Sequence, residues 1–173
     1  QKSRKLNLTE EDYFRIITGK TAALISACTA CGAKSATDDQ DVINLMKDFG
    51  ESLGIAFQIR DDILDYESTG LTGKPSGNDI KEKKITLPLI HALGNVPSPR
   101  KKQILGIVGN GRKSGQDIAE VVRFVMENGG IEYATMKMNQ YRDRALAILD
   151  TYPGSEVKNS LLEFVNYTVT RNK

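Results

Sequence analysis

The chain has 173 residues, a mass of 19.1 kDa and a formal net charge of +2 at pH 7. That length is enough for one folded domain with a hydrophobic core. The charge is close to neutral, so it gives no electrostatic case for nucleic-acid binding, and no run approaches the roughly 20 apolar residues of a membrane-spanning helix. We therefore expect a globular protein of the cytoplasm that neither binds nucleic acid nor spans a membrane.

The two cysteines, Cys28 and Cys31, form a single CxxC pattern within a run of small residues of helical character. Such a pattern can belong to a zinc site or to a redox pair. No second CxxC exists, and the only histidine, His91, is distant in the sequence. We predict that the cysteines are small residues buried in a helix, and that His91 is a core residue whose hydrogen bonds are satisfied.

Helical periodicity extends over most of the chain, and no stretch shows the alternation of a β-strand. A first helix is predicted to be capped by Thr9 and to end at Gly32. A long second helix starts near Asp38 or Asp39, and a loop with several glycines follows over residues 67–80. Further helices are predicted over residues 85–94, 98–108, 114–130, 131–152 and 155–171. The pattern indicates an all-α helical bundle with no domain boundary inside it.

The end of the long helix carries an unusual concentration of carboxylates. Asp61 and Asp65 are four residues apart and share a helix face, Asp62 lies beside Asp65, and Gln58 precedes Asp61 by three. Like charges at this spacing repel, and the helix dipole disfavours negative charge near a C-terminus. A bound cation removes both objections, and carboxylate oxygens suit Mg²⁺ held together with substrate phosphates. The spacing alone favours a metal site about as much as a solvated acidic surface.

The solvated alternative is an acidic helix end that is screened by water and by the cations Arg60, Lys74 or Lys84. Two glycines in the same helix, Gly50 and Gly54, are four residues apart and weaken it by roughly 0.5–1 kcal/mol each. They make sense where a ligand approaches closely or where another helix packs near. The second explanation is the more common one, so we expect a helix contact at these glycines.

Three linked segments resemble motifs of one enzyme family. "FQIRDDILDY" at 57–66 and "GKPSGNDIKEKKITLP" at 73–88 resemble the second aspartate-rich motif of the trans-isoprenyl diphosphate synthases, also called polyprenyl synthetases, and the segment that follows it. "ITGKTAAL" at 17–24 resembles the lysine-threonine motif of the same family. The order and spacing of the segments also match, and the resemblance covers nearly the whole chain.

The resemblance implies an all-α fold of the isoprenoid synthase type with a deep central cavity. The reaction that it implies joins an allylic diphosphate head-to-tail to isopentenyl diphosphate and releases pyrophosphate. Mg²⁺ ions bridge aspartates and the allylic diphosphate in this family. Carried over residue by residue, Asp61 matches a direct Mg²⁺ ligand, and Asp62 and Asp65 match the rest of the motif, with Asp65 acting through water.

The resemblance also implies a set of substrate-binding residues. Lys20 matches a lysine that contacts the allylic diphosphate, with Thr21 beside it, and Gln58 matches a glutamine near the reacting carbons. Lys74 matches a loop lysine on the diphosphate, and Lys84 is a further cation there. The family members so implied bind both diphosphates, and we expect Lys20, Gln58, Asp61 and Lys74 to be the catalytic residues.

Only one DDxxD motif is present, whereas the family has two that face each other. The resemblance therefore identifies residues 1–173 as the C-terminal part of a single polyprenyl synthetase domain, a bundle without its N-terminal helices. We expect that these 173 residues alone do not condense isoprenoids, and that the full-length protein is a homodimer. Arg171 resembles a terminal basic residue near the isopentenyl diphosphate site. Farnesyl, geranylgeranyl and octaprenyl products all remain open.

Two other classes of function compete with the enzyme. The chain could be a non-catalytic interaction subunit of a heteromeric prenyl diphosphate synthase, although such a subunit needs neither the DDxxD motif nor Lys20 and Lys74. It could also be a helical DNA-binding module, which the near-neutral charge and the lack of a basic recognition helix disfavour.

Overall fold

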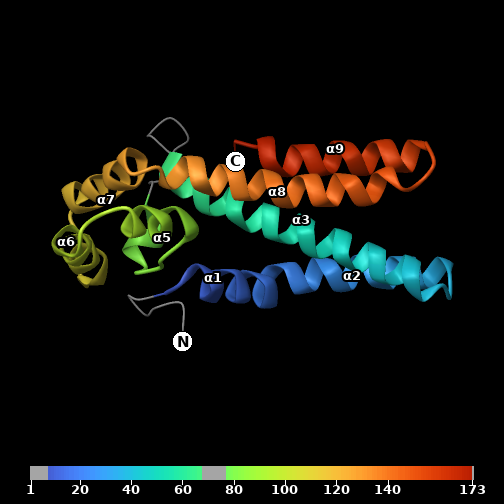
Figure 1. Ribbon diagram of the computed structural model, residues 1–173, viewed down its shortest axis with the longest axis horizontal. Coiled ribbons are helices and arrows are strands. Elements are labelled where there is room, and N and C mark those ends of the chain that lie inside the picture. Colours follow the sequence, from blue (N-terminus) through green and yellow to red (C-terminus); the bar gives the residue numbers. More distant parts are fainter. Residues whose placement is uncertain (1–7, 68–76, 173) are drawn as a thin grey trace. The chain divides into compact units, whose positions relative to one another are not determined.

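The computed structural model of the chain describes residues 8–67 and 77–172 (Figure 1). Every regular element within these two ranges is helical, which confirms the predicted all-α fold. The elements are α1 (Glu10–Ile17), η2 (Thr18–Ala22, a π-helical turn), α2 (Ala23–Ala36), α3 (Gln40–Glu67), α4 (Asn78–Lys81), α5 (Leu87–Gly94), α6 (Ser98–Gly109), α7 (Gly115–Glu127), α8 (Gly130–Asp150) and α9 (Glu156–Thr170).

The helix boundaries test the capping predictions. Thr9 caps α1 as predicted, because its Oγ1 accepts a hydrogen bond of 3.1 Å from the amide of Asp12. Asp39 accepts hydrogen bonds from two amides of the first turn of α3, as expected of the residue before a helix. The predicted end at Gly32 is wrong, since α2 continues to Ala36. Glycine raises the cost of a helix without stopping it, and the residues after Gly32 suit a helix.

The predicted loop over residues 67–80 is wrong at both ends, and its residues 68–76 lie outside the described ranges. α3 extends to Glu67, and α4 begins at Asn78, inside the range that we expected to be irregular. Gly77 directly precedes α4 with a φ of 75°, a left-handed conformation that glycine adopts without a steric penalty. Four residues of helix are too few for a periodic pattern in the sequence to reveal.

The chain forms two compact units. Of the described residues, unit 1 comprises 8–13, 61–67 and 77–135, and unit 2 comprises 14–60 and 136–172. The core of unit 1 is built from α5, α6, α7 and the end of α3. It includes Tyr66, which is fully buried and whose hydroxyl lies 3.1 Å from the Thr86 hydroxyl.

Unit 2 has its own apolar core. Phe49 and Leu53 of α3 pack with Ala145 and Leu149 of α8 and with Val165 of α9. α8 and α9 lie side by side there (Figure 1). Deleting any of these large buried side chains would leave a cavity, which costs roughly 2–5 kcal/mol for an aliphatic residue.

Gly50 and Gly54 face α2 within unit 2. A Cβ atom at Gly50 would lie 2.2 Å from the Thr29 Oγ1 and 2.8 Å from the Ile25 carbonyl oxygen. At Gly54 it would lie 2.6 Å from the Cα atom of Ala22. The glycines therefore permit a close helix contact, which confirms the expectation that another helix packs there.

The outer face of α2 departs from the predictions. Cys28 and Cys31 are both exposed and form no disulfide, so their predicted burial is wrong. Small residues surround the whole helix, and the sequence pattern therefore did not show which face turns toward α3. Leu24 is also exposed. The helical stretch Glu10–Ala36 is long and apolar enough to cross a membrane, but core helices of soluble proteins meet the same criteria of length and composition.

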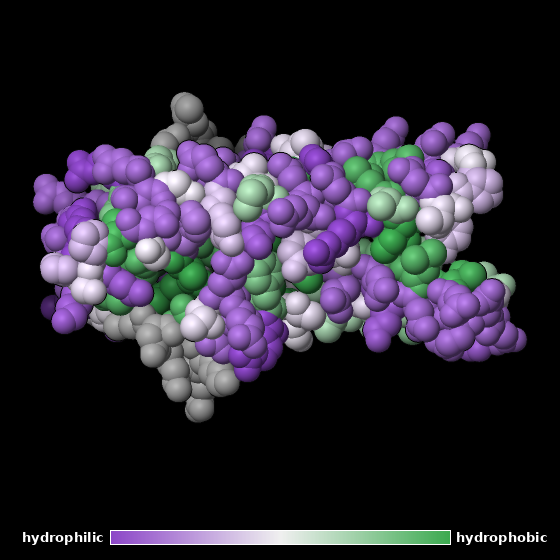
Figure 2. Space-filling view, viewed as in Figure 1, coloured by the Kyte–Doolittle hydropathy of each residue, from purple (hydrophilic) through white to green (hydrophobic). Residues whose placement is uncertain are grey.

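Hydrophilic residues cover most of the face shown in Figure 2, with hydrophobic patches between them. The large hydrophobic residues that are exposed within the described ranges include Val157, Phe164 and Tyr167 of α9. Single exposed apolar residues are ordinary on protein surfaces.

Replacing Gly54 with alanine tests the close contact between α2 and α3. We expect a loss of about 1–3 kcal/mol in the free energy of unfolding, because the new methyl group would overlap the backbone of Ala22. Urea unfolding followed by circular dichroism measures it. Gly32→Ala is the matched control: nothing lies within 4 Å of its Cβ position, so it should stabilise by about 0.5–1 kcal/mol. Equal stability of Gly54→Ala and wild type would contradict the contact.

Candidate functional site

The aspartates at the end of α3 have different surroundings. Asp62 is only 5% exposed, and its Oδ2 accepts a hydrogen bond of 2.7 Å from the hydroxyl of Tyr13 in α1. Burial raises the pKa of Tyr13 well above its usual value, and the Asp62 charge adds to the shift. The tyrosine therefore keeps its proton and donates a hydrogen bond to the carboxylate. Asp61, by contrast, is half-buried on the same turn.

Asp65 is bound to the backbone at the start of α4. Its Oδ1 accepts from the Asn78 amide at 3.0 Å, and its Oδ2 accepts from the Asp79 amide at 3.0 Å. Its backbone carbonyl accepts from the Gly77 amide at 2.9 Å. Burial raises the pKa of Asp65, while the two amide hydrogen bonds act in the opposite direction.

The other end of α4 turns sharply and presents Lys84. The Lys83 amide donates to the Ile80 carbonyl and the Lys84 amide donates to the Asp79 carbonyl, the bond pattern of a Schellman C-cap. Lys83 occupies the left-handed position of this motif with a φ of 59°. A non-glycine residue is unfavourable there by about 1–2 kcal/mol, and such strain is common at functional sites.

The Lys84 ammonium group lies among carboxylates of the same short segment. Its Nζ is 2.8 Å from Glu82 Oε2 and 3.1 Å from Asp79 Oδ1. The hydrogen bond to Glu82 raises the pKa of Lys84, and the bond to Asp79 adds to the shift against the effect of burial. The group is therefore a permanent cation that remains 43% exposed.

In unit 2, the lysine-threonine segment forms a π-helical turn. Thr18–Ala22 interrupts the helix between α1 and α2, with the Ala23 amide donating to the Thr18 carbonyl. Thr21 Oγ1 donates to Gln58 Oε1 at 3.0 Å, whereas Lys20 is exposed. Single π-helical turns inside α-helices are rare and occur mostly at functional sites. The sequence did not predict this turn, which has no simple compositional signal.

The end of α9 is attached to α3 within unit 2. Arg60 Nε and Nη2 donate to the Arg171 carbonyl at 3.0 and 2.9 Å. The Arg171 guanidinium lies 4.2 Å from the centre of the Phe57 ring, a cation–π contact. Lys74, which we predicted to contact the diphosphate, lies outside the described residues.

Comparison with known proteins now identifies the family. Residues 1–125 match the model of the polyprenyl synthetase family. The chain belongs to the polyprenyl synthetase family. It is 32% identical over 171 residues to octaprenyl diphosphate synthase of Escherichia coli, an alignment that covers 96% of this chain and 52% of that protein. Geranylfarnesyl diphosphate synthase of Aeropyrum pernix is 34% identical over 165 residues, with 94% and 51% covered.

Solved structures of the polyprenyl synthetase family share the fold. A polyprenyl synthase from Caulobacter crescentus, in complex with calcium and isoprenyl diphosphate, is 32% identical with a TM-score of 0.89, covering 99% of this chain and 52% of that one. The chain thus spans about half the length of the relatives it matches.

The described carboxylates of this chain suit a metal ion that is held by one or two carboxylates better than an ion that is held by three. Within the described ranges, no three His, Cys, Asp or Glu side chains converge as a metal site. Asp62 and Asp65 accept hydrogen bonds from Tyr13 and from amides, respectively. Mg²⁺ bound with phosphates commonly takes only one or two carboxylates, so the oxygen donors at this helix end suit such an ion.

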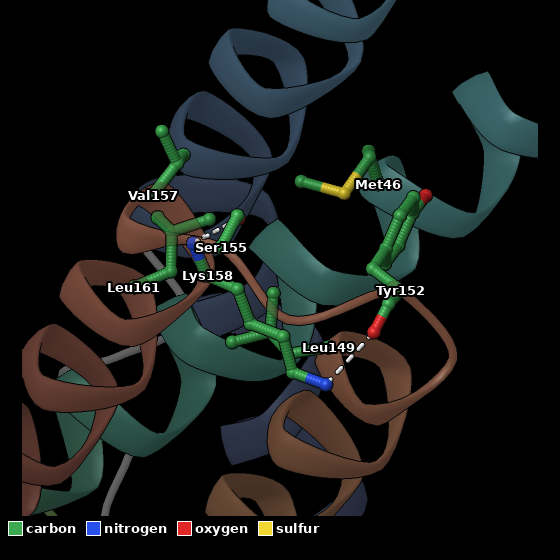
Figure 3. A pocket seen from close by; sticks show the side chains of 7 residues that line it. All are labelled: Met46, Leu149, Tyr152, Ser155, Val157, Lys158 and Leu161. Carbon is green, nitrogen blue, oxygen red and sulfur yellow. Dashed lines mark hydrogen bonds between the residues drawn. The ribbon is translucent and has the colours of Figure 1, made fainter.

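Two further features are His91 and a pocket whose lining includes none of these aspartates. His91 is half-buried rather than a core residue; its ring stacks on Tyr133 with a centroid distance of 3.9 Å, and its Nε2 lies 3.1 Å from Asn95 Nδ2. The pocket between α3, α8 and α9 measures about 180 Å³ and is lined mainly by apolar side chains such as Met46 and Leu161 (Figure 3). It is smaller than typical ligand sites and includes none of the predicted site residues.

Sequence reasoning missed Tyr13, Arg60 and Asp79 as partners of the site residues. Tyr13 and Asp62 are 49 residues apart, and Arg60 and Arg171 are 111 residues apart. No local pattern in a single sequence connects residues at such separations.

Replacing Tyr13 with phenylalanine tests the buried hydrogen bond to Asp62. We expect the free energy of unfolding to fall by about 1–3 kcal/mol, because a buried carboxylate loses a donor. Thermal and urea unfolding measure the change. In the control Tyr167→Phe, which removes a hydroxyl from a 63% exposed side chain, the change should stay within about 0.5 kcal/mol. Similar losses in both variants would contradict the role assigned to Tyr13.

Proposed function

We propose that this chain provides metal- and diphosphate-binding residues of a trans-prenyltransferase. The whole protein would join an allylic diphosphate head-to-tail to isopentenyl diphosphate and release pyrophosphate. One observation supports this most: a helix end with three aspartates is hydrogen-bonded, through Asp65, to a short segment that presents Lys84, in a member of the polyprenyl synthetase family. The homodimeric state and the cytoplasmic location of the whole protein are proposed from the resemblance alone.

Asp61 is the proposed direct ligand of Mg²⁺, with Asp62 and Asp65 supporting it. Mg²⁺, when bound, supplies positive charge that neutralises the leaving diphosphate. Tyr13 holds Asp62 as a buried carboxylate, which keeps negative charge at the helix end. The local negative potential favours a divalent cation there.

The lysines are the proposed contacts of the diphosphate oxygens. Lys84 offers an ammonium group that stays charged across the physiological pH range, and Lys20 offers an exposed one. Lys74 is proposed for the same task from the resemblance. Phosphate oxygens develop charge as the C–O bond breaks, so cations placed beforehand lower the barrier.

Gln58 is proposed to face the reacting carbons of the allylic group. The Thr21 hydroxyl donates to its Oε1, which fixes the orientation of the amide plane. Fixed dipoles stabilise a developing carbocation without having to reorganise during the reaction. In this scheme Thr21 acts through Gln58 and through its place in the π-helical turn.

Variants of the whole protein test the proposed function. We expect Asp61→Ala and Lys20→Ala each to lower the incorporation of labelled isopentenyl diphosphate at least about 100-fold, since each removes charge that stabilises the transition state. Lys102→Ala, a change to an exposed lysine of α6, is the control and should retain activity. Full activity of Asp61→Ala would contradict the proposal.

The 173-residue chain alone separates the enzyme from the interaction subunit. We propose that it binds pyrophosphate with Mg²⁺ but does not condense isoprenoids, because its relatives are about twice as long. Titration calorimetry and product analysis by chromatography measure both properties. Incorporation by the chain alone would refute the second statement, and unchanged Mg²⁺-dependent pyrophosphate binding in a folded Asp61→Ala variant would favour the non-catalytic subunit.

A further inference from the structure

The third aspartate of the motif has a more specific part than its neighbours. We propose that Asp65 is a positioning residue: it anchors the segment 77–84 through three backbone amides and thereby sets the place of Lys84. This inference rests on the proposed function for the role of Lys84, while the anchoring itself stands on the geometry of unit 1.

Asp65 accepts hydrogen bonds from three consecutive backbone amides. Both carboxylate oxygens and the backbone carbonyl receive the consecutive amides of residues 77, 78 and 79, at 2.9–3.0 Å. A carboxylate oxygen that accepts from an amide at this distance points at that amide. Each carboxylate oxygen therefore uses one of its two lone pairs on α4, which leaves fewer of them for a metal.

Asp79 connects Asp65 to Lys84. The amide of Asp79 binds Asp65, the carbonyl of Asp79 accepts from the Lys84 amide, and the carboxylate of Asp79 binds the Lys84 ammonium group at 3.1 Å. Asp79 thus links the anchor to the cation through both its backbone and its side chain. A shift of the Asp79 backbone would move Lys84.

The backbone conformation of segment 77–84 is constrained at both ends of α4 and by a buried side chain between them. Gly77 is buried in a left-handed conformation, and a Cβ atom there would lie 2.3 Å from Ile118 Cγ2. Lys83 keeps an unfavourable left-handed φ at the other end of α4. Ile80 between them is fully buried in the core of unit 1. Strain of this kind persists only where the surroundings impose it, and here it directs Lys84 back toward Asp79.

Two readouts without ligand test the anchor. In Asp65→Ala, we expect the amides of residues 78 and 79, which lose their acceptors, to exchange with solvent about tenfold faster by hydrogen–deuterium exchange, and Lys84 to react severalfold faster in competitive acylation followed by mass spectrometry. Ser155→Ala is the matched control: it removes the side-chain cap of α9, whose Oγ accepts from the Lys158 amide at 3.0 Å, and should leave residues 77–84 unchanged. Unchanged exchange and labelling in Asp65→Ala would overturn the inference.

A third readout separates positioning from metal binding. Pyrophosphate affinity is measured by calorimetry in the presence of Mg²⁺, and the Mg²⁺ midpoint is measured at saturating pyrophosphate. We expect Asp65→Ala to weaken pyrophosphate binding, and the double variant with Lys84→Ala to bind no more weakly than Lys84→Ala alone, because both changes act on one cation. The conservative Asp65→Asn, which keeps one oxygen acceptor, should recover part of the affinity with an unchanged Mg²⁺ midpoint.

A Mg²⁺ midpoint that moves in Asp65→Asn as far as in Asp61→Ala would make Asp65 a metal ligand and overturn the inference. Additive losses in the double variant would overturn it as well. If the wild type does not bind pyrophosphate at all, the proposed function fails, whereas exchange and labelling still decide whether Asp65 anchors the segment.

Discussion

Three like charges at the C-terminal end of one helix are the constraint on which the site depends. Mutual repulsion and the helix dipole both oppose this arrangement. The structure shows how two of the charges are stabilised: Asp62 by the buried hydroxyl of Tyr13, and Asp65 by the amides at the start of α4. Asp61 is the proposed ligand of the cation that accompanies a diphosphate. Under this proposal the three carboxylates of the motif have three different tasks.

Unit 2 holds polar residues on closely packed helices. Gly50 and Gly54 let α2 approach α3, and the π-helical turn brings Thr21 to Gln58. Arg60 of the same helix donates two hydrogen bonds to the carbonyl of Arg171, the residue that follows α9. In both units the predicted site residues depend on buried or backbone contacts and therefore on the packing around them.

The sequence predicted the elements well where the apolar period is long, and poorly where a local choice is made. The length of α3 and the cap at Thr9 were both predictable, because they follow from side-chain spacing and capping chemistry. The exposure of Cys28 was not, since small residues lie on every face of α2. The helix at 78–81 is only about one turn long, too short to show a repeating pattern, and its start depends on a carboxylate 13 residues earlier. For the site, residue types and spacing predicted the candidates, whereas the partners of Asp62 and Asp65 required the tertiary structure.

The central claim is that a divalent cation and a diphosphate bind together at the end of α3. Crystals of the protein grown with Mn²⁺ and pyrophosphate test it most directly, because anomalous scattering locates the metal. We expect an anomalous peak within coordination distance of the Asp61 carboxylate and of a pyrophosphate oxygen, with the Asp65 carboxylate still bound to the amides of residues 78 and 79. A metal bound elsewhere, or pyrophosphate bound without a metal at Asp61, would contradict it.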